Sequence, residues 1–392
     1  MTTPAWKAAL RLQLTPGLGL RRNKLLVEAW GGCAQVLDAP DPALRDILGE
    51  RVWAALRAEP PEWAAEVAAV EQWLAAATAG VRHAVLAWGD PDYPAALCEL
   101  ADPPLLLFVA DAEAVDAPVH WPASVALVGS RGATPQGLAI TRQWATELAE
   151  AGWCVASGLA HGIDAAAHGG ALQSQRPGLL TMAFMGTGPD LIYPPAHAHL
   201  KSRIQARGRC VTEYLPGQRA RKMHFPLRNR LLVALSAGVV VIEADLRSGS
   251  LISAQSALDL GREVMAVPGS IRSPLSQGCH ALLRQGANLV TSSADIIASL
   301  PPLVLQPGAS IPADTQSPAT DAAAQAALMP ALDPQWVRRL QAALGHDPWT
   351  VDELWIRLGG SWADLQAGLL ALEWQGVLAR LPGDRVQWVG QG

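Results

Sequence analysis

Three glycine-containing turns follow apolar, strand-like runs and carry groups that can hold a phosphate. The turns are Gly129, Ser130 and Arg131 after SVALV, Ser157 and Gly158 after WCVAS, and Gly186, Thr187 and Gly188 after LLTMAFM. Glycine lets the backbone approach a ligand closely, hydroxyl groups donate hydrogen bonds, and a guanidinium forks onto a phosphate. If neighbouring strand ends bring these turns together, they form one anion-binding rim, as in doubly wound sheets. The alternative is that each glycine only ends its strand.

A basic segment with an embedded aromatic ring points to unpaired nucleic acid. The chain has a net charge of −5, but residues 201–230 carry nine Lys or Arg and one acid, Glu213. Single strands are held by cations along the backbone and by bases that stack on aromatic faces. We therefore expect Phe225, which is embedded among basic residues that include Lys222, Arg228 and Arg230, to stack a base. The alternative is that Phe225 is a buried anchor for the loop.

A fourth turn, with Ser248, Gly249 and Ser250, follows the run GVVVIEA and opens a predicted helix. Free N–H groups and two hydroxyls at a helix start can seat a phosphate. An ordinary serine cap gives the same sequence pattern, so both interpretations stay open.

Metal and cofactor sites have weak support in the sequence. Asp164 and His168 are four residues apart on a predicted helix beyond His161, but the fuller ligand set of a metallohydrolase is missing. We expect Asp164 to brace the loop after Ser157 instead. No G-x-G-x-x-G opens the first strand–helix unit and no Walker motif occurs, so no dinucleotide or ATP cofactor is predicted.

From Ser124 to about Ser299, strand-like segments alternate with helical ones. These segments must position the residues described above. The strand-like runs are SVALV, WCVAS, LLTMAFM, RCVTE, GVVVIEA, EVMAV and NLV. Continuous apolar runs are typical of strands buried on both faces. The alternation predicts an α/β fold, a Rossmann-like, doubly wound and mostly parallel sheet within residues 81–300.

Two flanking regions have different patterns. Residues 1–80 predict short helices without strands, interrupted by LTPGLGL, where a Pro-Gly-x-Gly turn either grips a phosphate or makes a tight connection. Residues 301–334 hold seven prolines and no Lys or Arg, which predicts a linker. Residues 335–392 predict three helices and a hairpin around PGD, typical of a winged-helix-like module.

Composition narrows the cellular setting. Five cysteines lie more than fifty residues apart, which predicts reduced, mostly buried thiols rather than a disulfide framework or a zinc site. No apolar run approaches the roughly 18 residues of a membrane span, and the first residues do not form a signal peptide. We therefore expect a cytoplasmic protein without membrane contact.

Taken together, these residues resemble the DNA-processing protein A family, also called Smf. Four blocks carry the resemblance: VALVGSRGATPQG at 125–137, ASGLAHGIDAAAHGGAL at 156–172, HFPLRNRLLVALS at 224–236, and EADLRSGSLISAQSALDLGREVMAVPGS at 243–270. The flanks resemble the family's N-terminal helical domain, of the sterile-alpha-motif or helix–hairpin–helix type, and its C-terminal domain less specifically. Two positions depart from the pattern, since His161 stands where the family usually has Arg, and His224 where it usually has Asn.

The resemblance implies a dimeric mediator that binds and protects incoming single-stranded DNA and loads a RecA-type recombinase during natural transformation. It implies that Arg131 holds a phosphate, that Phe225 stacks a base, and that Arg228, Asn229 and Arg230 line the groove. On this basis the protein is expected not to be an enzyme.

Two other functions fit parts of the sequence. Rossmann-like folds also host nucleotide-processing enzymes of the phosphoribohydrolase type, for which Glu243 or Asp164 would be the acid. Alternatively the C-terminal module reads the DNA, but residues 335–392 have no excess of basic residues and so lack the usual footprint.

Overall fold

A computed structural model describes most of the chain, and it divides into two compact units. Described are residues 4–78, 80–112, 118–303, 334–344, 348–359, 377–381 and 385–388, with five further residues at 365, 368, 369, 372 and 373. One unit comprises residues 1–133 and 141–301, and the other comprises residues 134–140 and 302–392. Nearly all of the predicted linker lies outside the described residues.

The N-terminal region is helical, and no strand occurs in its described residues, as predicted. Its helices are α1 (Ala5–Leu14), α2 (Leu20–Trp30), α3 (Cys33–Asp38), α4 (Asp41–Leu48), α5 (Glu50–Arg57) and α6 (Trp63–Ala75). The glycine turn separates α1 from α2, with Gly17 at a φ of 84° that favours glycine. Buried residues of these helices belong to the same hydrophobic core as the sheet.

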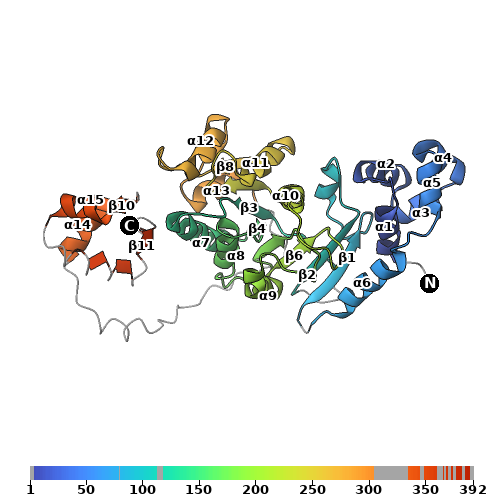
Figure 1. The fold of residues 1–392 in the computed structure, drawn as a ribbon, viewed down its shortest axis with the longest axis horizontal. Helices are drawn as coiled ribbons and strands as arrows, with labels where there is room; N and C mark the ends of the chain where they lie inside the picture. Colours follow the sequence, from blue (N-terminus) through green and yellow to red (C-terminus); the bar gives the residue numbers. More distant parts are fainter. Residues whose placement is uncertain are drawn as a thin grey trace. The chain divides into compact units, whose positions relative to one another are not determined.

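The central sheet has the order β1-β2-β6-β5-β4-β3-β7-β8-β9 (Figure 1). All seven predicted strands are present: β3 (Ser124–Val128), β4 (Cys154–Ser157), β5 (Thr181–Phe184), β6 (Arg209–Thr212), β7 (Gly238–Val241), β8 (Glu263–Ala266) and β9 (Asn288–Leu289). From β6 to β9 every neighbouring pair is parallel. The Rossmann-like, doubly wound prediction is confirmed.

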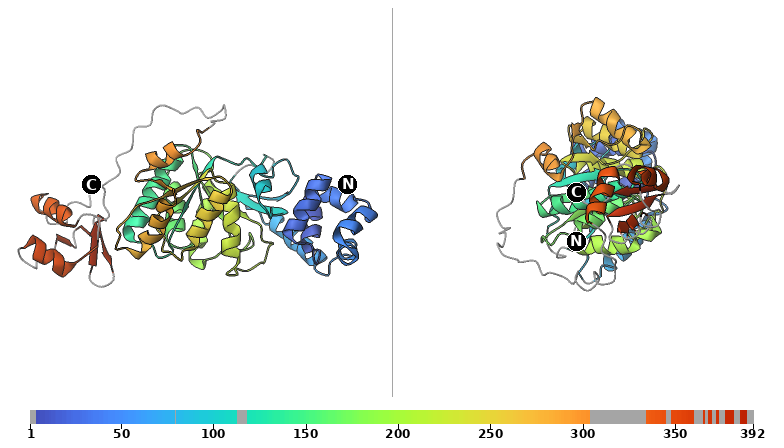
Figure 2. Two further views of the ribbon diagram at one scale, coloured as in Figure 1. Left: turned by 90° about the horizontal axis from the view of Figure 1, so that it is seen from above. Right: turned by 90° about the vertical axis from the view of Figure 1, so that its left-hand side faces the viewer.

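Helices cover both faces of the sheet, and the chain reverses direction across it at β3. Strands β4, β5 and β6 follow on one side of β3 through α7 (Pro135–Glu150), α8 (Ile163–Ala171) and α9 (Ala198–Arg207). Strands β7, β8 and β9 follow on the other side through α10 (His224–Ala234), α11 (Gly249–Asp259) and α12 (Gln277–Arg284), before α13 (Ser293–Ser299). Figures 1 and 2 show the two helix layers. The gap between the ends of β3 and β7 is the switch point, where ligands bind in such folds.

Two strands that the sequence patterns did not indicate extend the sheet in the antiparallel sense. They are β1 (Arg82–Ala87) and β2 (Leu106–Asp111), and β2 pairs with β6. A buried charge cluster holds the three strands together: Arg82 Nη2 lies 2.9 Å and Arg209 Nε lies 2.7 Å from Asp111 Oδ2. All three side chains are at most 1% exposed, so the carboxylate must compensate both cations.

The C-terminal unit contains a winged helix. Its described elements are α14 (Pro334–Leu344), β10 (Trp349–Thr350), α15 (Val351–Leu358), β11 (Leu378–Leu381) and β12 (Arg385–Trp388). The strands form an antiparallel sheet in the order β10-β12-β11. A separate hydrophobic core that includes Leu340, Leu354 and Val386 stabilises this unit. The hairpin turn and most of the predicted third helix lie outside the described residues.

The cysteines are free, as predicted, and only Cys98 is more than marginally accessible. Burial raises the pKa of Cys33, Cys154 and Cys210 to about 12 and that of Cys279 to about 11. In the part of the chain that the structure describes, no helix combines the length and hydropathy needed to cross a membrane.

Candidate nucleic-acid interface

The turns after β3, β4 and β7 meet at the switch point. The backbone N–H of Ser130 donates to Glu243 O at 2.8 Å, and the N–H of Ile163 donates to Ser130 O at 3.2 Å. Gly162 has a φ of 75°, and a Cβ at this position would overlap the carbonyl oxygen of Ser130. The close approach of the turns therefore requires glycine there. As the sequence predicted, the strand ends share one edge.

Arg131 and Phe225 are far apart in the sequence, in the first and third of the four blocks, and lie together on this edge. The guanidinium carbon of Arg131 is 5.6 Å from the ring centroid of Phe225. Arg131 is exposed and Phe225 is half-buried. Phe225 is therefore not a fully buried residue, as the alternative of a loop anchor would have it. The pair places a cation and an aromatic face next to each other.

A second aromatic side chain, which the sequence patterns did not indicate, lies beside Phe225. The ring of Tyr193, which is 50% exposed, lies 5.3 Å from that of Phe225. The exposed His161 packs edge-on at 4.8 Å against His197, the last residue of a short 3-10 helix (Pro195–His197) before α9. We call Ser130, Arg131, Tyr193 and Phe225 the rim. Tyr193 could have been found as an aromatic residue shortly after the Gly186–Gly188 turn.

Arg228 differs from the expectation of a groove-lining cation. Arg228 is only 4% exposed, and its Nη1 donates to the carbonyl oxygens of Gly158 and Phe184. Burial lowers the pKa of this guanidinium to about 10, an effect that the neighbouring Asp164 opposes. Arg228 therefore holds the N-terminal part of α10 against the ends of β4 and β5, and it sets the position of Phe225 three residues earlier.

Asp164 braces the loop after Ser157, as predicted. Its Oδ2 accepts from the N–H of Ala160 at 3.2 Å, and burial raises the pKa of this carboxyl although Arg228 opposes the shift. Gly158 allows this arrangement, because a Cβ there would overlap the Arg228 guanidinium and lie 2.7 Å from Asp164 Oδ2. The described residues contain no cluster of three or more potential metal ligands.

Two predicted groove residues make protein contacts beyond the rim. Asn229 accepts from Arg228 Nε at 2.8 Å and donates to Ser253 Oγ at 2.9 Å, which ties α10 to α11. Arg230 Nη2 donates to Glu213 Oε2 at 2.5 Å, and its Nε lies 3.4 Å from Asp102 Oδ1. The Arg230 side chain is thus neutralised by carboxylates on the side of the N-terminal helices.

The predicted serines also differ in accessibility: Ser157 is buried, whereas Ser248 is half-buried. Ser157 is completely buried, and its hydroxyl donates to Leu127 O at 2.7 Å. Ser248 caps α11, because its Oγ accepts from the N–H of Ser250 at 3.3 Å. Ser248 is half-buried and Gly249 is exposed, so the helix start stays accessible. Gly129 and Ser130 are half-buried at the switch point, and Lys222 is exposed in the segment before α10.

Comparisons with known proteins give matches over the part of the chain that contains this site. The family model of DNA recombination-mediator protein A matches residues 84–301, and a DprA winged helix domain matches residues 312–384. The chain is 44% identical over 210 residues to DNA processing protein DprA of Streptococcus pneumoniae, which covers 53% of this chain and 71% of that protein. It is also 34% identical over 315 residues to Protein Smf of Synechocystis. This match covers 76% of the present chain and 78% of Protein Smf. The X-ray structure of the Streptococcus pneumoniae protein has a TM-score of 0.63 at 33% identity, over 77% of this chain and 99% of that one.

Proposed function

Since the chain belongs to the DNA recombination-mediator protein A family, we propose that it binds single-stranded DNA at the rim as a mediator without catalytic activity. In this proposal Arg131 contacts a phosphate and Phe225 stacks a base. Lys222 adds charge along the strand, and Gly129, Ser130, Gly158, Ser248, Gly249 and Ser250 supply backbone and hydroxyl donors at the strand ends and helix starts.

The observation that carries the proposal is the pairing of an exposed guanidinium with a half-buried aromatic ring at the switch point. The pair offers one cation and one stacking face, the two contacts that a single nucleotide needs. Tyr193 widens the aromatic surface beside Phe225. A duplex keeps its bases stacked inside, so this surface favours an unpaired strand.

The proposal places the protein in a recombination pathway. It would act in the cytoplasm as a homodimer, protect incoming single strands and load a RecA-type recombinase onto them during natural transformation. The family to which the chain belongs supports this role, because its description is that of a recombination mediator.

The nucleotide-processing alternative has less support from the positions of its acids. Asp164 is buried and already accepts the N–H of Ala160, beside Arg228. Glu243 uses its backbone carbonyl to hold Ser130 in place. Neither contact directs a carboxyl toward a ligand at the rim.

A binding titration of the full chain tests the proposal. Fluorescence anisotropy is measured with one labelled oligonucleotide, first as a single strand and then annealed to its complement, at two salt concentrations. We expect tighter binding of the single strand and a steep loss of affinity with salt, because phosphate contacts release counterions. Salt-independent binding, or equal affinity for the duplex, would contradict it. Release of free base from nucleoside monophosphates would favour the enzyme instead.

A further inference from the structure

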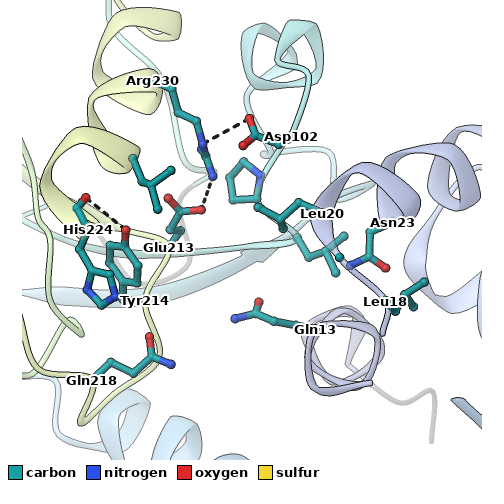
Figure 3. Close-up of a pocket in the computed structure, with 14 residues that line it drawn as sticks. Gln13, Leu18, Leu20, Asn23, Asp102, Glu213, Tyr214, Gln218, His224 and Arg230 are labelled. Carbon is teal, nitrogen blue, oxygen red and sulfur yellow. Dashed lines mark hydrogen bonds and ion pairs between the residues drawn. The ribbon is translucent and has the colours of Figure 1, made fainter. Parts of the chain in front are cut away.

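A cavity of about 350 Å³ opens between the N-terminal helices and the basic segment. The N-terminal side contributes Gln13, Leu18, Gly19, Leu20 and Asn23, and the sheet side contributes Asp102, Pro104, Leu105, Glu213, Tyr214, Gln218, His224, Leu227 and Arg230 (Figure 3). The walls combine leucine side chains with two aromatic rings, those of Tyr214 and His224, and three amides. This is the composition of a small-molecule or single-base site.

Asn23 is a buried polar side chain that lacks a partner. It is 1% exposed, and its amide oxygen has no hydrogen-bond partner among the described residues. An amide that is not fully hydrogen-bonded is destabilising, and because Asn23 also lines the cavity, a ligand there can complete the contacts of this amide. Figure 3 shows the Asn23 amide turned toward the cavity, with those of Gln13 and Gln218 facing the ring of Tyr214. No side chain caps the start of α2 at Gly19, which leaves backbone donors there as well.

The charges of the cavity select against a phosphate. Its charged residues are Asp102, Glu213 and Arg230, and the guanidinium already lies against both carboxylates. Without a net positive charge, the cavity suits a neutral group with donors and acceptors on its edge. Amide side chains bind such edges, and the ring of Tyr214, stacked on His224 at 3.9 Å, offers an aromatic surface.

The cavity and the rim meet at the start of α10. His224 lines the cavity, while the next residue, Phe225, belongs to the rim. We infer that the cavity is a second subsite for the bound strand and takes one unpaired nucleobase, with its edge on the amides and its face on Tyr214. This inference rests on the proposed single-strand binding, and it extends the path of the strand from the sheet edge to the N-terminal helices.

An abasic scan of a short oligonucleotide tests the inference with the full chain. One position at a time loses its base, and affinity is measured by anisotropy. We expect two sensitive positions, one for Phe225 and one for the cavity. In Asn23→Leu the base at the second position should no longer matter, and the intact strand should bind about 5- to 10-fold more weakly, as for one lost hydrogen bond in a buried site.

Asn23→Leu removes an amide whose oxygen has no hydrogen-bond partner among the described residues, so the variant should keep its fold. Gln13→Leu is the second cavity variant and should weaken binding in the same way. Gln72→Leu on α6, an exposed amide that does not line the cavity, is the matched control and should bind normally. Stable Asn23→Leu and Gln13→Leu variants with wild-type affinity and an unchanged scan would overturn the inference.

Two further arms separate the possible outcomes. Deoxynucleosides at millimolar concentration are added in a thermal-shift assay. A stabilisation that depends on Asn23, together with an unchanged abasic scan, would mean that the cavity takes free nucleosides, which overturns the strand assignment. Phe225→Ala is measured in parallel: if it weakens binding and Asn23→Leu does not, the second subsite is refuted and the proposed function stands. If neither change matters, the proposed function fails as well.

Discussion

At the scale of single residues, Arg131 and Phe225 should contribute to binding in different ways. Replacing Arg131 with Ala removes one phosphate contact. The slope of log affinity against log salt concentration should therefore become less negative by roughly 0.7, the value for one contact to a single strand. Replacing Phe225 with Ala should weaken binding by about 1–3 kcal/mol with little change of slope, because stacking releases no counterions. Salt titrations of both variants check this. Identical changes of slope would contradict the division of roles.

The buried His168 should make the free energy of unfolding depend on pH. Its Nδ1 lies 2.7 Å from Thr181 Oγ1, whose hydroxyl donates to Val155 O, and its Nε2 has no partner among the described residues. Burial lowers the pKa of this imidazole to about 3. The unfolded chain binds a proton below about pH 6.5 while the folded chain does not, so stability should fall between about pH 6.5 and 3, by up to about 1.4 kcal/mol per pH unit.

Denaturant unfolding of His168→Leu at several pH values measures this contribution. The variant should lose part of the pH dependence over this range. His199→Leu on α9 is the control, because His199 is exposed. Equal pH dependence in wild type and His168→Leu would show that another group causes the acid sensitivity.

At the scale of elements, the charge cluster of β1, β2 and β6 should dominate the stability of that sheet edge. Asp111→Ala leaves Arg82 and Arg209 buried without their carboxylate, which should destabilise the protein by about 3–5 kcal/mol in chemical denaturation. Glu71→Ala breaks the exposed pair with Lys7, 2.7 Å apart, and should cost less than about 1 kcal/mol. A small effect of Asp111→Ala would mean that the strands are held by packing alone.

The elements also show what the sequence can predict. The seven parallel strands were recognisable because each is a short apolar run next to a glycine turn. Strand β1 was missed because RHAVLA begins with a charged and a polar residue, and the partner that buries Arg82 lies 29 residues away. The meeting of the turns was predicted from the strand ends, but Arg228, Arg230 and Ser157 were expected to contact DNA because their residue types bind phosphate. Only the tertiary structure reveals that these side chains already donate hydrogen bonds to backbone carbonyls or to a carboxylate.

At the scale of the whole molecule, DNA binding and the winged helix should be separable. The winged helix has its own hydrophobic core, and residues 335–392 carry no excess of basic residues. A chain that ends at residue 334 should therefore bind single-stranded DNA with nearly the affinity of the full chain in the anisotropy assay. A loss of more than about tenfold, or 1.4 kcal/mol, would give the module a direct role in binding.

The burial of the thiols has a practical consequence for spectroscopy. Maleimide labelling requires a thiolate, and four of the five cysteines are both shielded and hard to deprotonate. Burial also raises the pKa of Cys98, the half-accessible one. A cysteine introduced at an exposed position would thus carry a dye almost selectively after a single Cys98→Ser change. Distances between the α/β unit and a bound strand then become measurable by energy transfer.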